Sequence, residues 1–108
     1  MGIGQRTTPA GMPSVKYSVQ AIADLQRLHD FLAIQDKDVA KRAIAVIRDA
    51  LTKIAVMPER FRPVKGRIYL REAIIDFGSS GYIVRFRHLP GDDILIARIK
   101  HQKEDDFS

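Results

Sequence analysis

The stretch that decides the fold runs from Gly81 to His101 and reads GYIVRFRHLPGDDILIARIKH. Residues 82–88 and 94–101 are rich in β-branched and aromatic side chains, as strands are. The PGDD segment between them, residues 90–93, has the composition of a turn. The stretch therefore predicts two strands of an antiparallel hairpin.

The apolar side chains of this hairpin set its register. They are Val84 and Phe86 in the first strand, and Leu95, Ala97 and Ile99 in the second. Side chains alternate between the two faces of a strand, and the apolar residues have even numbers in the first strand and odd numbers in the second. The two sets therefore share a face only if the residue numbers of each cross-strand pair add up to an odd number. A four-residue loop at 90–93 gives that register, in which Val84 pairs with Ile99 and Phe86 with Ala97.

The other face of the predicted hairpin carries positive charge. The same register places Arg85 opposite Arg98, with Arg87 and Lys100 on the same side. Like charges that are directly opposed in a sheet destabilise it. We therefore expect one apolar face for a layer of helices, and one basic face that stays strained until an anion binds there.

Upstream of the hairpin, the hydrophobic period changes from that of a strand to that of a helix and back. Residues 14–19 and residues 68–77 each predict a strand. Two amphipathic helices lie between them, with Ser18 and Asp38 as N-caps and Pro58 ending the second helix. Their apolar stripes are Ile22, Leu25, Leu28 and Leu32, then Ala40, Ala43, Ile44, Ile47, Leu51 and Ile54.

The order strand, helix, helix, strand, strand, strand predicts an α+β fold, βααβββ. We expect an antiparallel sheet with the helical hairpin packed on one face. On the first helix, Asp24, Arg27 and Asp30 are expected to face away from that sheet. Residues 58–67, PERFRPVKGR, predict a basic loop with two prolines.

Length and composition limit the class of protein. A chain of 108 residues forms one domain, for which we expect residues 14–107, while the Gly-, Thr- and Pro-rich residues 1–13 are typical of a disordered leader or a tag. There is no cysteine, so disulfide and thiolate chemistry are excluded. No apolar run approaches the roughly 18 to 20 residues of a membrane span, and no signal peptide is visible. These features predict a cytoplasmic protein with no membrane partner.

The positive charge is concentrated in the second half of the chain. The formal net charge is +5, and residues 60–103 hold 10 Lys and Arg against 4 Asp and Glu. Such a balance predicts an acidic partner, either nucleic acid or an acidic protein segment. A basic surface that only interacts with solvent is the alternative.

One histidine lies where it could take part in catalysis. His101 ends the last predicted strand, next to Lys100 and close to Arg98. An imidazole among cations could act as a general acid or base on a phosphodiester, with arginine holding the phosphate. A structural hydrogen bond at the end of a strand is the alternative. The three histidines have no metal-ligand spacing, and we expect neither a metal nor a cofactor.

The segments LREAIIDFGSSGYIVRFR and GDDILIARIKHQKE, together with the order of elements, resemble the RelE/ParE superfamily of bacterial toxins. The resemblance covers residues 14–107. It implies the toxin of a type II toxin–antitoxin module, held inactive by a cognate acidic, partly disordered antitoxin that folds as it binds. It further implies that the toxin meets operator DNA only through the antitoxin complex.

The superfamily contains two activities. RelE-type toxins cleave mRNA in the ribosome, whereas ParE-type toxins poison DNA gyrase without a recognised catalytic centre. The RelE pattern has Arg, Arg and Tyr where this chain has Gly78, Gln102 and Phe107. These departures favour a ParE-like gyrase inhibitor that is not an enzyme. The alternative is a RelE-like ribosome-dependent mRNA endonuclease with His101 as its catalytic residue. Under either reading, the residues expected to contact the target or the antitoxin are Arg71, Arg85, Arg87, Arg98, Lys100 and His101.

Overall fold

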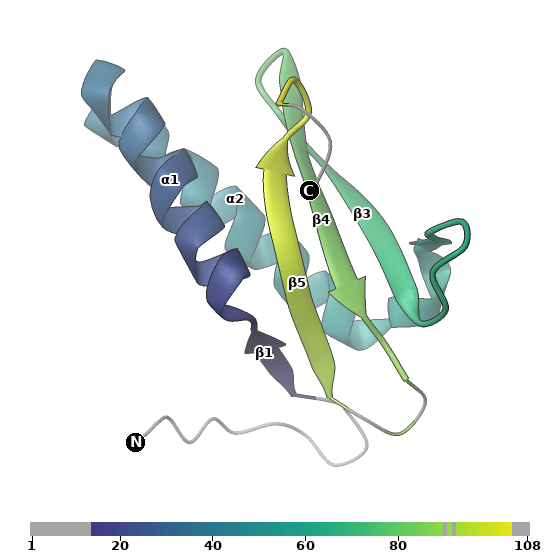
Figure 1. Cartoon of the computed structure of the whole chain (residues 1–108). Coiled ribbons are helices and arrows are strands. Elements are labelled where there is room, and N and C mark those ends of the chain that lie inside the picture. Colours follow the sequence, from purple (N-terminus) through teal and green to yellow (C-terminus); the bar gives the residue numbers. More distant parts are fainter. Residues whose placement is uncertain (1–13, 90, 92, 105–108) are drawn as a thin grey trace.

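The structure is a computed structural model that describes residues 14–89, 91 and 93–104, so the predicted leader and Phe107 lie outside the described residues. Two helices pack on one face of a five-stranded sheet, which confirms the predicted α+β fold (Figure 1). The elements are β1 (Val15–Tyr17), α1 (Val19–Gln35), α2 (Lys37–Val56), the 3-10 turn η1 (Pro58–Arg60), β2 (Arg62–Pro63), β3 (Leu70–Phe77), β4 (Ser80–Arg87) and β5 (Ile94–His101).

The strand order in the sheet is β1-β5-β4-β3-β2. The pairs β2–β3, β3–β4 and β4–β5 are antiparallel, but β1 lies parallel to β5, with Val15 opposite Ile94. The predicted antiparallel sheet is therefore confirmed for these three pairs, and only the edge strand β1 departs from it. The helical hairpin carries the chain from β1 at one edge of the sheet to β2 at the opposite edge, and β3, β4 and β5 then follow in order until β5 lies beside β1. The predicted 58–67 loop also contains an element, because its residues Arg62 and Pro63 pair with β3.

The predicted register of the β4–β5 hairpin holds for four of its six residue pairs, from Tyr82–His101 to Arg85–Arg98. Val84 pairs with Ile99 as expected. Phe86, however, pairs with Ile96 and not with Ala97, because the register shifts between Arg85 and Phe86. Such a shift is a β-bulge, in which one strand carries an extra residue.

The bulge improves burial in the core. Ile94, Ile96 and Ile99 are all fully buried. In a regular strand, Ile99 would lie on the face opposite to that of Ile94 and Ile96. The irregular backbone also leaves the Ala97 carbonyl free to accept a hydrogen bond from Ser18 Oγ at 2.7 Å. The register therefore follows burial and a contact between distant parts of the chain, which the hairpin sequence does not contain.

The helix caps agree with the sequence at one end and differ at the other. Ser18 is the N-cap of α1, and its Oγ accepts from the Ala21 amide at 2.9 Å. The N-cap of α2 is Asp36, not the predicted Asp38. The Asp36 carboxylate accepts from the amides of Asp38 and Val39 at 2.9 and 3.2 Å. Asp38 instead adds negative charge to the first turn, where it is favourable.

The two helices contribute unequally to the core. The stripe predicted for α2 is confirmed, since Ala40, Ala43, Ile47, Leu51 and Ile54 are all buried. On α1, Leu28 is buried, but Ile22 is 58% exposed although the stripe predicted it in the core. Asp24, which was expected to face away, is instead only 2% exposed. Among the described residues, no helix has both the length and the hydropathy to span a membrane.

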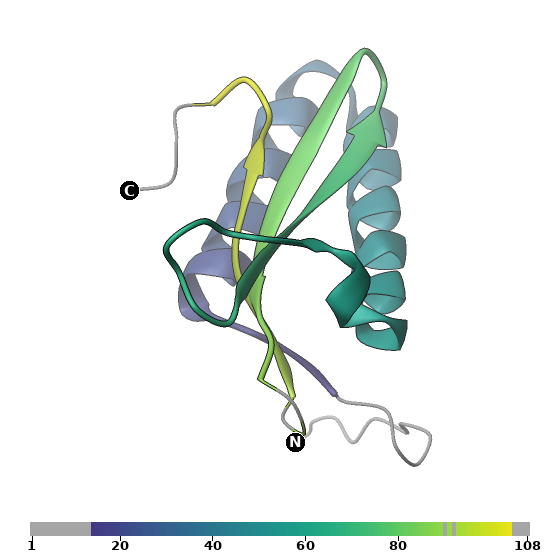
Figure 2. The ribbon, with the colours of Figure 1, turned by 90° about the vertical axis from the view of Figure 1, so that its right-hand side faces the viewer.

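The connection from η1 to β3 extends beyond the two layers of the fold (Figure 2). Figure 2 shows it running from the side of α2, past the edge of the sheet, toward the opposite side. We name residues 61–70 the 61–70 connection. We name the side of the sheet away from the helices the open face.

Candidate functional site

A row of charged side chains crosses the open face. Glu72 lies opposite Arg85, and Arg85 lies opposite Arg98, as the sequence predicts for the two arginines. Arg85 Nε donates to Glu72 Oε2 at 2.7 Å, and Arg98 Nε donates to Asp24 Oδ2 at 2.9 Å. The expectation that this face stays strained until an external anion binds is therefore wrong, because the fold supplies both carboxylates.

The carboxylate of Asp24 closes the edge of β5. β1 pairs with β5 only as far as Ile96, and beyond that point α1 covers the edge. Asp24 accepts from the Ile99 amide at 2.8 Å, from Arg98, and from Arg27 Nη1 at 2.6 Å. Burial by itself raises the pKa of Asp24, but the hydrogen bonds from Arg98, the Ile99 amide and Arg27 together hold that pKa below its ordinary value.

Sequence reasoning missed Asp24, although a signal was present. Ala21, Asp24 and Leu28 are spaced by three and four residues, so Asp24 lies on the helix face that carries two buried side chains. What the sequence could not show is the set of partners, because Arg98 and Ile99 follow Asp24 by 74 and 75 residues.

His101 joins two turns at the far end of β5. Its Nδ1 accepts from the Lys103 amide at 3.1 Å, so in this arrangement the ring hydrogen lies on Nε2. That Nε2 donates to Ser80 Oγ at 2.9 Å, and the ring packs edge-on against Tyr82 with centroids 5.5 Å apart. Glu104 Oε1 in turn accepts from the His101 amide at 2.9 Å. Both ring nitrogens are thus engaged in holding the turn before β4 and the turn after β5.

The remaining predicted site residues lie in different surroundings. Lys100 is buried, and its Nζ donates to the Glu104 carbonyl at 2.9 Å. Arg71 lies at the other end of the sheet, opposite the core residue Phe86, and its Nη1 donates to the Phe61 carbonyl at 2.7 Å. Arg87, by contrast, is exposed. The fold therefore brings Arg85, Arg98 and Lys100 together on the open face of β4 and β5. His101, paired with Tyr82, and Arg71, paired with Phe86, lie instead at the two ends of the face that packs on the helices.

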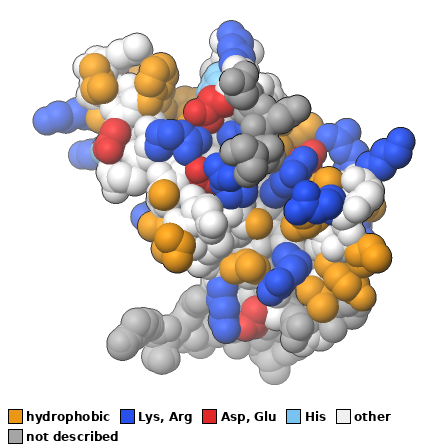
Figure 3. All heavy atoms as spheres, viewed as in Figure 1, with side chains coloured by type: hydrophobic (Ala, Val, Ile, Leu, Met, Phe, Trp, Pro, Cys, Tyr) orange, Lys and Arg blue, Asp and Glu red, His pale blue; other side chains and the backbone are white. Residues whose placement is uncertain are grey.

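The open face is mixed in character. Figure 3 shows Lys and Arg side chains with hydrophobic side chains between them. One source of this pattern is the row next to the arginines, in which Ile74, Ile83 and Lys100 are paired across β3, β4 and β5. Ile74 is exposed. A surface that alternates cations with apolar side chains can bind an acidic polypeptide as well as a nucleic acid.

Comparison with known proteins places the chain in a family. The model of the family described as "ParE toxin of type II toxin-antitoxin system, parDE" matches residues 15–106. The chain is also similar to two proteins of Caulobacter vibrioides. It is 32% identical to Toxin RelE3 over 93 residues, which cover 86% of this chain and 98% of that toxin. It is 35% identical to Toxin RelE1 over 91 residues, which cover 84% of this chain and 95% of that toxin.

A solved chain from the chromosomal ParDE TA system of P. aeruginosa has the same fold. The TM-score is 0.69 at 21% sequence identity, over 83% of this chain and 96% of the solved one. The resemblance of the sequence to the RelE/ParE superfamily is therefore confirmed. Because the family match spans nearly all of the described residues, this chain belongs to the ParE toxin family of type II toxin–antitoxin systems.

Proposed function

We propose that this toxin inhibits DNA gyrase in the cytoplasm and does not cleave RNA itself. The observation that carries the proposal is the state of His101, whose two ring nitrogens bond to Ser80 Oγ and the Lys103 amide. A general base needs a nitrogen lone pair directed at the proton that it removes, and the one lone pair of this ring, on Nδ1, accepts from the Lys103 amide. The cations of the same strand are also engaged, Arg98 with Asp24 and Lys100 with a carbonyl oxygen. This arrangement supports a binding surface over a catalytic centre.

The test measures two targets side by side with the purified full chain. Without antitoxin and in molar excess over gyrase, the toxin should block supercoiling of plasmid DNA and leave DNA broken in the gyrase complex. Translation of a reporter mRNA in a cell extract should continue in the presence of the same amount of toxin. Cut mRNA with normal supercoiling would reject the proposal.

A ribosome-dependent mRNA endonuclease is the second candidate, and it is favoured by the names of the two relatives, both called RelE toxins. Two variants separate it from a structural role of His101. His101→Ala and Ser80→Ala both remove the 2.9 Å bond between these side chains, but only the first removes the imidazole. Catalysis predicts that His101→Ala alone abolishes growth arrest while antitoxin binding is kept. A structural role predicts similar, small effects of both variants.

Membership of the family implies a cognate antitoxin. We propose that it is acidic and contacts exposed Arg87 together with the groove between the helices, and that operator DNA is bound only through this complex. A cavity of about 590 Å³ lies in that groove, lined among others by Tyr17, Ile22, Ile44 and Arg48. An amphipathic segment with apolar anchors and carboxylates fits such a groove.

The antitoxin contact is best tested at Arg87. Substitution of Arg98 by Glu would place a second carboxylate against Asp24 and so disturb the fold, and Arg85 is bound to Glu72 in the same way. Arg87→Glu should weaken the complex by roughly 3- to 10-fold at low salt, and less at high salt. Arg42→Glu, the same change at an exposed position of α2 that does not share a helix face with the groove residues Ile44 and Arg48, is the control. Equal affinities of both variants and the wild type would show that the contact lies elsewhere.

A further inference from the structure

Two departures from ordinary local structure meet at the base of the 61–70 connection. Tyr69 has a φ of 70°, the one positive φ of a non-glycine residue in the described part of the chain. This region is costly for a bulky side chain. His88 is 9% exposed, and its Nδ1 has no hydrogen-bond partner among the described residues. The two residues are joined, because the His88 amide donates to the Tyr69 carbonyl at 2.8 Å.

The backbone around Tyr69 is fixed by its own hydrogen bonds. The Val64 amide donates to the Leu70 carbonyl at 2.9 Å, the Arg67 amide to the Val64 carbonyl at 3.1 Å, and the Leu70 amide to the Arg67 carbonyl at 3.2 Å. None of these bonds uses a side chain, so glycine at position 69 would keep all of them and remove the strain. Tyr69 is also 52% exposed, which limits what its ring adds to the core. The fold itself therefore gives little reason for tyrosine at this position.

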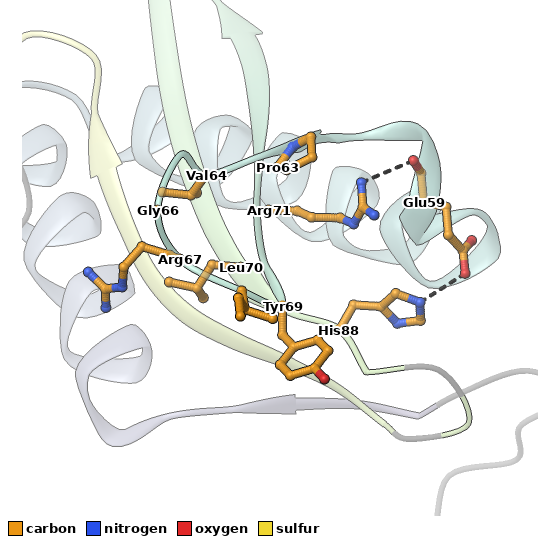
Figure 4. A pocket seen from close by; sticks show the side chains of 10 residues that line it. Glu59, Pro63, Val64, Gly66, Arg67, Tyr69, Leu70, Arg71 and His88 are labelled. Carbon is orange, nitrogen blue, oxygen red and sulfur yellow. Dashed lines mark hydrogen bonds and ion pairs between the residues drawn. The ribbon is translucent and has the colours of Figure 1, made fainter.

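The 61–70 connection exposes large apolar, aromatic and basic side chains next to one another. Ile68 is 81% exposed next to Tyr69, and Arg67 is exposed on their other side. Beside them lies a cavity of about 510 Å³, with Pro63 and Leu70 among its apolar walls. Figure 4 shows Arg67 and Glu59 at opposite ends of this cavity, with Tyr69 between them. In protein interfaces, tyrosine and arginine are enriched among the few residues that contribute most of the binding energy.

The charges around the cavity indicate the chemistry of the partner. Arg67 lines the cavity and Lys65 lies two residues before it; both are exposed, and neither has an ion pair with a carboxylate among the described residues. The one acidic side chain that lines the cavity, Glu59, is bound to His88 at 2.8 Å. A partner should therefore bring carboxylates to the cations. The strongly exposed Ile68 needs an apolar surface to cover it, which favours a protein over a nucleic acid.

We propose that Arg67, Ile68 and Tyr69 form a preformed contact site for a folded protein with an acidic surface and an apolar side chain that enters the cavity. The partner is the target of the toxin and not the antitoxin, an assignment that rests on the proposed function. A segment that folds as it binds can adapt to many surfaces, whereas a rigid target needs a contact site that is already in place. The backbone hydrogen bonds that hold Tyr69 at its positive φ supply that rigidity.

The experiment compares Tyr69→Gly and Ile68→Ala with a matched control, Ile34→Ala. Ile34 is 85% exposed on α1, so it loses a similar amount of exposed apolar surface away from the proposed site. Tyr69→Gly should keep or raise the thermal midpoint, since it removes strain. It should nevertheless lower gyrase inhibition and growth arrest at least about tenfold, the loss expected for one central aromatic contact. Ile68→Ala should act in the same direction, Ile34→Ala should not, and antitoxin affinity should stay within about threefold in all three.

Several results would overturn the inference. Full inhibition by Tyr69→Gly would show that the tyrosine is not part of a contact site. A loss of antitoxin affinity with unchanged inhibition would identify the antitoxin as the occupant. Loss of binding to a DNA duplex with unchanged inhibition would identify a nucleic acid. If the wild type arrests growth but does not inhibit gyrase, the proposed function fails, and growth arrest by the same variants still tests the contact site.

Discussion

Replacement of Asp24 by Ala should destabilise the toxin by about 2–4 kcal/mol. The magnitude follows from the partners that are left behind. The buried Ile99 amide donates to this carboxylate at 2.8 Å and would lose its acceptor. Leaving a buried amide without a hydrogen bond costs about 1–3 kcal/mol. The side chains of Arg98 and Arg27 are 30% and 43% exposed, so water replaces part of what they lose, and together they add only about 1 kcal/mol.

Denaturation by urea measures this loss as a change in midpoint at constant slope. Asp24→Asn keeps a carbonyl oxygen for the amide of Ile99 but loses the charge, so it should cost less, about 1–2 kcal/mol. Asp49→Asn is the control, because Asp49 is 69% exposed and pairs with Lys53 within one helix at 3.3 Å, which predicts less than about 0.5 kcal/mol. If Asp24→Ala costs no more than this control, the reasoning about the edge of β5 is wrong.

The same carboxylate should make the stability depend on pH. The pKa of Asp24 lies below its ordinary value in the folded protein, so the group contributes stability above its unfolded pKa and loses it as the pH falls through the folded pKa. The free energy of unfolding of the wild type should therefore fall below about pH 4, and that of Asp24→Asn should fall less steeply. Equal slopes for both proteins would contradict this assignment. The measurement is a series of urea titrations between neutral and acidic pH.

Two further predictions concern the sheet. Gly81→Ala should prevent normal pairing of β3 with β4, because the added Cβ would lie 1.9 Å from the Ile75 carbonyl oxygen. Gly78→Ala is the milder change, because there is open space around Gly78 and only its φ of 64° is unfavourable for alanine. It should lower the free energy of unfolding by only about 1 kcal/mol in a thermal melt. Phe86→Ala should cost about 3–5 kcal/mol, because the ring is fully buried and packs edge-on against Phe61 at 5.8 Å. A loss below about 1 kcal/mol would mean that the core closes around the gap.

Local patterns in the sequence correctly predicted those features of the fold that depend only on residues close together in the chain. The Ser18 cap and the stripe of α2 need only their own segment, and both are confirmed. The N-cap of α2 was wrong by two residues, because Asp36 and Asp38 are chemically equivalent and only the tight turn between the helices decides between them. The parallel position of β1 depends on the path of the whole helical hairpin, and no residue of the strand encodes it.

The hairpin register shows where local reasoning stops. The alternation of side chains correctly placed Val84 opposite Ile99, but it treated β5 as regular. The odd residues Leu95 and Ala97 looked like the apolar face, whereas the even residues Ile94 and Ile96 are the buried ones. Burial of larger side chains decided the register beyond the bulge, at a place where the two apolar patterns of the strand compete.

The basic face illustrates the same limit in the functional site. The sequence pattern correctly predicted that Arg85 and Arg98 lie opposite each other. The expectation that they need an external anion followed from that pairing alone. Glu72 and Asp24 meet that need inside the protein, so these arginines serve the fold first. A partner that depends on positive charge must then use cations with no internal carboxylate. Arg67 meets that requirement, because it is exposed and has no ion pair with a carboxylate among the described residues, so the proposed target contact lies at the 61–70 connection and not at the centre of the sheet.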